Sequence, residues 1–135
     1  MTYCGIDVGK NWGWGIYNPE MGILHGSEKF QTLVHFEERI RHLIMGLDVN
    51  AVVTCRAMGR NQQVIRFHSA MAAIVEYFCE KHGISYFDVA DGSMRKVVIG
   101  KGNAKKPEVM AFLKIENEHA ADAMCGAKYL AAITI

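Results

Sequence analysis

The hydrophobic pattern of the first thirty residues predicts three short strands. Residues 2–9 are rich in β-prone side chains and end at Gly9, and residues 23–30 (ILHGSEKF) form another candidate strand. Between them, WGWGIYN (12–18) alternates large residues with glycine, which is typical of a strand packed closely against a neighbour. The NPEMG stretch that follows has turn chemistry. The pattern therefore predicts an antiparallel meander.

The remainder of the chain alternates between helical periodicity and short apolar runs. Residues 32–47 place large apolar side chains at helical spacing, with Thr32 as the expected N-cap. A long helix is expected over 64–82, with Gly83 just past its end. Pro107 is expected to open a helix that runs to about Lys114. Further helices are predicted over 92–100 and 117–133, and buried strands over 50–55 and 84–89.

This order of elements indicates an α/β fold. Strand–helix–strand units after an antiparallel meander predict a mixed five-stranded sheet, in which parallel strands extend the meander and helices flank it. Neither a linker nor a repeat interrupts residues 1–135, so we expect a single domain.

Composition sets only broad limits on function. Half of the 135 residues are hydrophobic, and the formal net charge is +1, so any basic surface must come from local clustering. The four cysteines form no C-x-x-C pair, which favours reduced, buried thiols and a cytoplasmic location. Asp7 and Lys10 interrupt the apolar start, and no apolar run approaches membrane-spanning length.

Three residues with metal-binding chemistry stand out in apolar surroundings. Asp7 is a carboxylate within a stretch that is expected to be buried, where a charge is costly unless a partner or a metal compensates it. His119 and Asp122 are three residues apart on the alanine-rich last helix and share one face. Together they would form a hard-ligand set for Mg²⁺ or Mn²⁺. Taken alone, Asp122 and His119 are more often ordinary helix-surface residues.

Three stretches resemble the RuvC family of Holliday junction resolvases, most closely its small phage and prophage members. They are GIDVG (5–9), VVIGKGNAKKPEV (97–109) and HAADAMCGAKY (119–129), and the resemblance covers nearly the whole chain. GIDVG alone is unspecific, since sugar-kinase-like ATPases have similar strands. The resemblance implies a ribonuclease H-like fold and one RuvC-like nuclease domain over 1–135.

The family pattern also implies roles for individual residues. Asp7 would bridge two divalent ions, Mg²⁺ or in its place Mn²⁺, while Asp122 and His119 would complete the metal site. Family members carry Asp or His at the position of His119. Arg95 and Lys106 fall where the family places basic residues beside the scissile phosphate. The implied reaction is two-metal hydrolysis of a phosphodiester.

One position departs from the family pattern. The family has a catalytic glutamate at the end of its fourth strand, where this chain has Cys55. A thiol is a soft ligand with a free pKa of about 8.5, whereas Mg²⁺ prefers oxygen. Three explanations remain open: a weakened or inactive junction-binding relative, another acid such as Glu76 or Glu118 in its place, or an altered position. On chemistry alone, the favoured interpretation of Cys55 is a small buried strand residue.

A basic segment predicts contact with nucleic acid. RKVVIGKGNAKK (95–106) places lysines next to glycines that would let the backbone approach a phosphate. On its own, such a run is often a solvated surface. The candidate DNA-binding residues are Arg56, Arg60, Arg95, Lys96, Lys101, Lys105 and Lys106, with Arg66 as a neighbour of the first two.

The helix over 64–82 carries apolar residues on several sides, which suggests a partner unless flanking helices bury it. The family forms homodimers through this helix, and a two-fold dimer suits a four-way junction.

From the site residues and the resemblance together, we expect a metal-dependent, structure-selective endonuclease that cuts four-way junctions and related branched DNA. The alternatives are a junction-binding protein without cleavage and a nuclease for RNA–DNA hybrids.

Overall fold

The computed structural model describes residues 1–56 and 61–134, and it confirms the predicted α/β class. The sheet has the order β3-β2-β1-β4-β5, in which β1, β2 and β3 pair antiparallel and β4 runs parallel to both β1 and β5. The strands are β1 (Tyr3–Asp7), β2 (Asn11–Asn18), β3 (Gly22–Lys29), β4 (Ala51–Arg56) and β5 (Ser85–Ala90). The helices are α1 (Leu33–Gly46), α2 (Gln62–Lys81), α3 (Asp91–Val98), α4 (Lys106–Leu113) and α5 (Glu118–Ile133).

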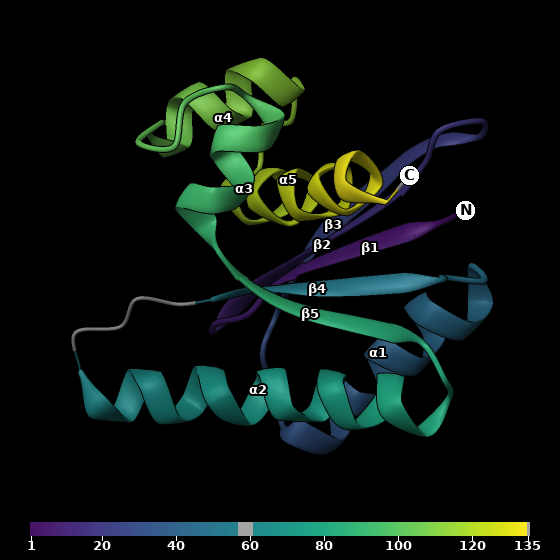
Figure 1. Ribbon diagram of the computed structural model, residues 1–135. Coiled ribbons are helices and arrows are strands. Elements are labelled where there is room, and N and C mark those ends of the chain that lie inside the picture. The colour runs from purple at the N-terminus through teal and green to yellow at the C-terminus, as the bar shows by residue number, and fades with distance from the viewer. Residues whose placement is uncertain (57–60, 135) are drawn as a thin grey trace.

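Helices cover both faces of the sheet. Figure 1 shows α1 and α2 on one face and α5 on the other, with α3 and α4 beside α5. Each face has its own buried cluster. The α1–α2 face is filled by large side chains such as Trp12, Phe36 and Met71, and the α5 face is rich in alanine and other small residues.

Glycines allow α5 to lie against the backbone of β1 and β2. A Cβ added to Gly5 would overlap the carbonyl of Ala123, and one added to Gly13 would overlap the carbonyl of His119. At Gly15 the added atom would lie 2.7 Å from the Cα of Met124. The close packing predicted from the alternating glycines is confirmed, and the neighbour is α5. This contact fixes the height of α5 above the sheet.

Local chemistry explains where several elements begin and end. The Thr32 hydroxyl accepts a hydrogen bond from the His35 amide at 3.0 Å and caps α1, as predicted. Gly83 follows α2 with φ 67°, the left-handed conformation that glycine tolerates. The Asn61 side chain accepts from the Gln63 amide at 2.7 Å. This cap starts α2 at Gln62, two residues earlier than the apolar pattern predicted.

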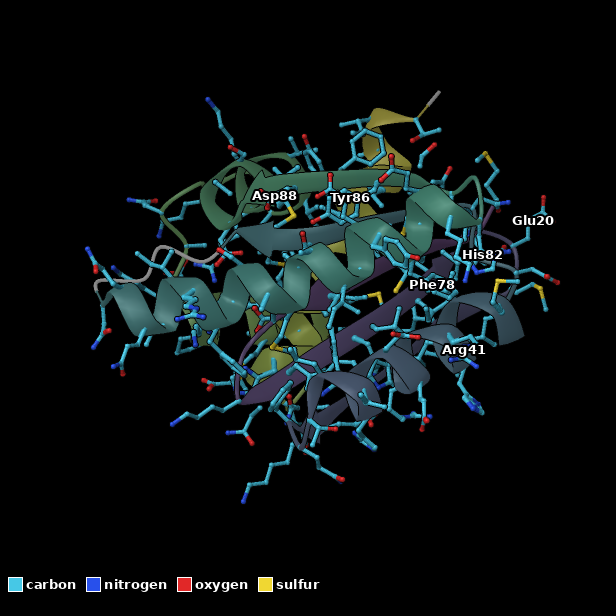
Figure 2. All side chains as sticks on the ribbon, turned by 90° about the horizontal axis from the view of Figure 1, so that it is seen from below. Glu20, Arg41, Phe78, His82, Tyr86 and Asp88 are labelled. Carbon is cyan, nitrogen blue, oxygen red and sulfur yellow. The ribbon has the colours of Figure 1, made fainter. Side chains whose placement is uncertain are left out.

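One face of α2 is buried within the chain, whereas Val64, Ile65 and Tyr77 are exposed. Met71, Val75, Phe78 and Cys79 pack into the cluster of the α1–α2 face. Figure 2 shows Phe78 and His82 together near the end of α2, where their ring centroids lie 4.4 Å apart. Among the described residues, no helix has the length and apolar character that crossing a membrane requires.

Candidate active site

The sequence-predicted catalytic residues line one pocket of about 350 Å³. It opens where β1 and β4 end, between those strands, α5 and the start of α3. The pocket is lined by Asp7, Val8, Gly9, Lys10, Asn11, Cys55, His68, Asp91, Lys106, His119 and Asp122. The structure thus brings together residues from six separate parts of the sequence.

Asp7 is the last residue of β1, which ends two residues before Gly9. It therefore lies at the end of the strand and not in the middle of a longer one. Its side chain is 18% exposed, so Asp7 is partly buried, whereas the sequence predicted a buried charge. His119 Nδ1 lies 3.3 Å from Asp7 Oδ2. This hydrogen bond, followed by the charges of Asp7 and Glu118, raises the pKa of His119 against the opposing effect of burial. Asp7 therefore already has one partner from α5.

The N-terminus of α5 holds His119 in place. The Asn117 side chain accepts hydrogen bonds from the amides of His119 and Ala120, each at 3.0 Å. These bonds satisfy donors that the first turn of a helix leaves unpaired. Because Gly13 lets this turn rest on β2, the cap and the glycine together set the position of His119 relative to Asp7.

Asp122 lies one turn further along α5 and is buried, unlike an ordinary helix-surface residue. Arg95 Nη2 donates to Asp122 Oδ1 at 3.0 Å, and Arg95 Nη1 donates to the Ala104 carbonyl at 2.9 Å. Burial and then the Asp7 carboxylate raise the pKa of Asp122, although Arg95 opposes this shift. Arg95 therefore ties α3, the 101–105 loop and α5 together at the pocket.

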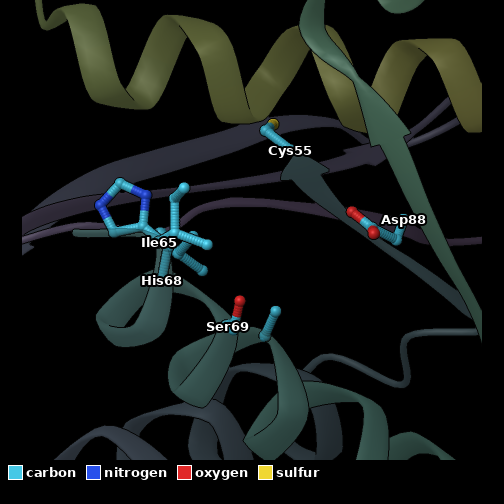
Figure 3. A pocket seen from close by; sticks show the side chains of 7 residues that line it. Cys55, Ile65, His68, Ser69 and Asp88 are labelled. Atoms are coloured by element: carbon cyan, nitrogen blue, oxygen red, sulfur yellow. The ribbon is translucent and has the colours of Figure 1, made fainter. Parts of the chain in front are cut away.

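Cys55 is buried at the end of β4, between α5 and α2 (Figure 3). Burial, followed by the charges of Asp7, Asp91 and Asp122, raises the pKa of its thiol well above the usual value. The thiol is therefore protonated at neutral pH, and its sulfur lies 3.8 Å from the Asp122 carbonyl oxygen. A neutral thiol is a poor ligand for a hard cation.

Sequence reasoning missed Asp91, the first residue of α3. Its carboxylate shares the pocket with Asp7 and Asp122. Burial and then these two carboxylates raise the pKa of Asp91 to about 6, against the effects of Arg95 and of a hydrogen bond with Cys55. Its position directly after the predicted parallel strand 84–89 was the available signal, because ligands gather at the carboxyl ends of such strands.

His68 was also missed, and it joins the pocket to a smaller hollow. That hollow has a volume of about 70 Å³ and lies on the α2 side of the sheet. Figure 3 shows Cys55 and Asp88 facing Ile65, His68 and Ser69 across it. The end of β4 is therefore accessible from both pockets.

The predicted basic residues are distributed unevenly around the pocket. Lys106 lines it, and its Nζ lies 3.8 Å from the Glu118 carboxylate. Lys101 is exposed and pairs with Glu108 at 3.0 Å, while Lys96 and Lys105 are exposed on the same side. Arg60 and the side chain of Arg56 lie outside the described residues.

The donor set suits a divalent ion in kind but is not arranged around one. Asp7, Asp91 and Asp122 offer the oxygen atoms that Mg²⁺ and Mn²⁺ prefer. Within 1–56 and 61–134, no three His, Cys, Asp or Glu side chains are arranged so that they could hold one ion together. The side chains would have to converge, and Asp122 would have to turn from Arg95. The residues fit the cation by chemistry, although their present arrangement does not surround one.

Comparison with solved structures identifies the fold. RuvC of Thermus thermophilus superposes with a TM-score of 0.78 at 18% identity, covering 97% of this chain and 93% of that one. The chain has a RuvC-like resolvase fold. The yeast mitochondrial Holliday junction resolvase Ydc2 gives a TM-score of 0.56 at 12% identity, with 96% and 77% covered. The Fowlpox virus resolvase bound to substrate Holliday junction DNA gives 0.55 at 13%, with both chains fully covered.

The likeness to these proteins is one of fold. No protein-family model matches the sequence, and no curated protein matches it either. The predicted RuvC-like, ribonuclease H-like architecture is confirmed, since the mixed sheet and its helices superpose over nearly the entire chain.

Proposed function

We propose that this protein is a divalent-metal-dependent endonuclease that cuts four-way DNA junctions and related branched DNA. The observation that carries the proposal is the meeting of Asp7, His119 and Asp122 in one open pocket of a RuvC-like fold. Two structural neighbours were solved with Holliday junction substrates, which supports DNA as the partner. The basic side chains on the α3–α4 side would contact phosphates.

Each residue of the pocket would have a definable task. Asp7, His119 and Asp122 would hold the metal, for which His119 must be neutral and must give up its bond to Asp7. Bound Mg²⁺ or Mn²⁺ would supply an activated hydroxide and stabilise the leaving 3′ oxygen. Lys106 would neutralise phosphate charge at the rim of the pocket. Arg95, which holds Asp122 before binding, would be free to pair with the phosphate once Asp122 turns.

The proposal includes a homodimer formed through α2 and the adjoining sheet edge. Four apolar residues of α2 are buried within the chain, but Val64 is 41%, Ile65 44% and Tyr77 64% exposed. Phe87 on the edge strand β5 is 37% exposed. Figure 2 shows Tyr86 and Asp88 of that strand beside α2. A two-fold dimer on this side would present two pockets to the two strands of a symmetric junction.

The decisive experiment measures cleavage of a labelled synthetic four-way junction in Mg²⁺ and in Mn²⁺. We expect the parent to cut and Asp7→Asn to lose roughly 10³-fold in rate, because metal stabilisation of the transition state contributes several kcal/mol. Junction binding should persist in the variant. Asp48→Asn is the matched control, since Asp48 lies next to the opposite end of β4 and its left-handed backbone (φ 51°) tolerates asparagine. Equal cleavage by the parent and Asp7→Asn would refute the metal site.

A second candidate function is junction binding without cleavage. The protonated Cys55 thiol favours it, because β4 then offers no carboxylate to the metal. Under this alternative only Cys55→Glu would cut, while the parent, Asp7→Asn and Cys55→Glu would all bind junctions. Both candidates require that binding weaken steeply with salt, since phosphate contacts release counterions. Salt-independent binding would exclude both.

A further inference from the structure

We propose that Asp91 supplies the metal-binding carboxylate that β4 lacks, so that the site is complete without a glutamate at position 55. The inference rests on the proposed function, because it names a further ligand at the same pocket. The proposed acid comes from α3 and not from the end of β4, where the RuvC-family pattern has a glutamate.

The register of the sheet places Asp91 beside Cys55. In the parallel β4–β5 pair, Cys55 lies opposite Val89 and Arg56 lies opposite Ala90. Asp91 follows Ala90 directly, where the chain leaves β5 and begins α3. A carboxylate at this point reaches the pocket from the neighbouring strand, and a hydrogen bond links it to the Cys55 side chain. The Asp91 carboxylate therefore comes from the end of β5, one strand away from position 55 at the end of β4.

The surroundings of Asp91 call for a cation. Its carboxylate shares a partly enclosed pocket with those of Asp7 and Asp122. Arg95, one turn along α3, is already engaged by Asp122 and by the Ala104 carbonyl. A divalent ion is the ligand that would compensate three carboxylates at once.

The acids considered from the sequence do not reach the pocket. Glu118 is exposed at the first turn of α5, where it contacts His119 Nε2 at 3.3 Å and Lys106 Nζ at 3.8 Å. Glu76 is exposed on α2, and its charge acts on Cys79 and Tyr86. Neither residue lines the pocket that holds Asp7.

The competing interpretation is that Asp91 serves only α3. An acidic residue in the first turn stabilises a helix through its dipole, and Asp91 also attracts Arg95. The two interpretations predict different changes in Tm for Asp91→Asn in the absence of metal. Removing a purely structural acid would lower the Tm. Removing one of three crowded carboxylates would leave the Tm unchanged or raise it.

The test is calorimetric titration of Mn²⁺ into the whole chain, with thermal unfolding in EDTA as the second readout. The proteins are the parent, Asp91→Asn, Asp7→Asn, the control Asp48→Asn, and Asp91→Asn combined with Cys55→Glu. We expect Asp91→Asn to weaken Mn²⁺ binding at least about tenfold, since even outer-shell residues of metal sites are worth roughly 10–100-fold. Asp48→Asn should bind like the parent, and Cys55→Glu should restore part of the affinity lost in Asp91→Asn.

The outcomes separate this inference from the proposed function. Full Mn²⁺ affinity in Asp91→Asn, with affinity lost in Asp7→Asn, would overturn the role of Asp91 and leave the proposed function standing. A lower Tm of Asp91→Asn in EDTA, without rescue of binding by Cys55→Glu, would assign Asp91 to α3 alone. A parent that neither binds Mn²⁺ nor cuts a junction would overturn the proposed function and this inference together.

Discussion

The two faces of the sheet are built on different packing rules. On the α1–α2 face, large side chains fill the space, and the ring centroids of Trp12 and Phe36 meet edge to face at 4.9 Å. On the α5 face, Gly5 and Gly13 remove side chains altogether, so that the helix rests on strand backbone. The pocket carboxylates from β1 and α5 meet at the end of this second interface.

The difference separates stability from geometry. A filled core gains free energy from buried apolar area, and it absorbs small shifts by repacking. Direct backbone contact leaves no side chain to adjust, so the height and rotation of α5 follow from the sheet itself. We infer that the α1–α2 face chiefly stabilises the chain, and that the α5 face sets the distance from Asp7 to His119.

The largest effect on stability is expected on the α1–α2 face. Phe36 is fully buried, and Phe36→Ala should lower the free energy of unfolding by about 3–5 kcal/mol. The control Val34→Ala, on the same helix but 70% exposed, should change it little. Denaturant unfolding measures both. Junction cleavage per folded molecule, measured well below the Tm, should match the parent for Phe36→Ala, and a specific loss of cleavage would break the division between faces.

A smaller loss of stability with a larger loss of activity is expected on the α5 face. Gly13→Ala would drive a methyl group into the His119 carbonyl, and overpacking of this kind costs about 1–3 kcal/mol. Because α5 would have to shift, cleavage and Mn²⁺ binding should fall beyond the change in folded fraction. Gly46→Ala is the matched control, since an added Cβ at the end of α1 meets nothing within 4 Å. Unchanged activity in a folded Gly13→Ala protein would show that the close contact does not position the site.

The smallest effect is a pH dependence confined to the pocket. The folded state raises the pKa of Asp91 to about 6 from an ordinary 3.8. The protonated form therefore stabilises the folded chain fully below the ordinary value, and this contribution is lost as pH rises through about 6. In EDTA, the Tm of the parent should fall relative to that of Asp91→Asn by a few degrees across this window. A Tm difference that is independent of pH would contradict the crowding of the three carboxylates.

Most of the fold could be predicted because local sequence patterns specify its helices and strands. Thr32 caps its helix and Gly83 ends another, and the alternation in 12–18 indicated close packing. The proximity of Asp7 to His119 was expected because both residues carry metal-binding chemistry in apolar surroundings.

The features of the site that the sequence did not reveal depend on register and on long-range partners. The place of Asp91 in the pocket follows from the pairing of β4 with β5, which no local pattern specifies. Arg95 was predicted to face DNA, and its bond to Asp122 joins residues 27 apart. The raised pKa of the Cys55 thiol follows first from burial and then from the charges of three carboxylates, and only folding creates both conditions.

The contact between His119 and Asp7 also has a kinetic consequence, because it joins residues 112 positions apart. Loop-closure entropy opposes such contacts until much of the intervening chain is ordered, and non-local pairing slows folding. The pocket should accordingly be among the last parts of the molecule to assemble. The meander and α1, whose contacts are short in sequence, should form before α5 docks across β1 and β2.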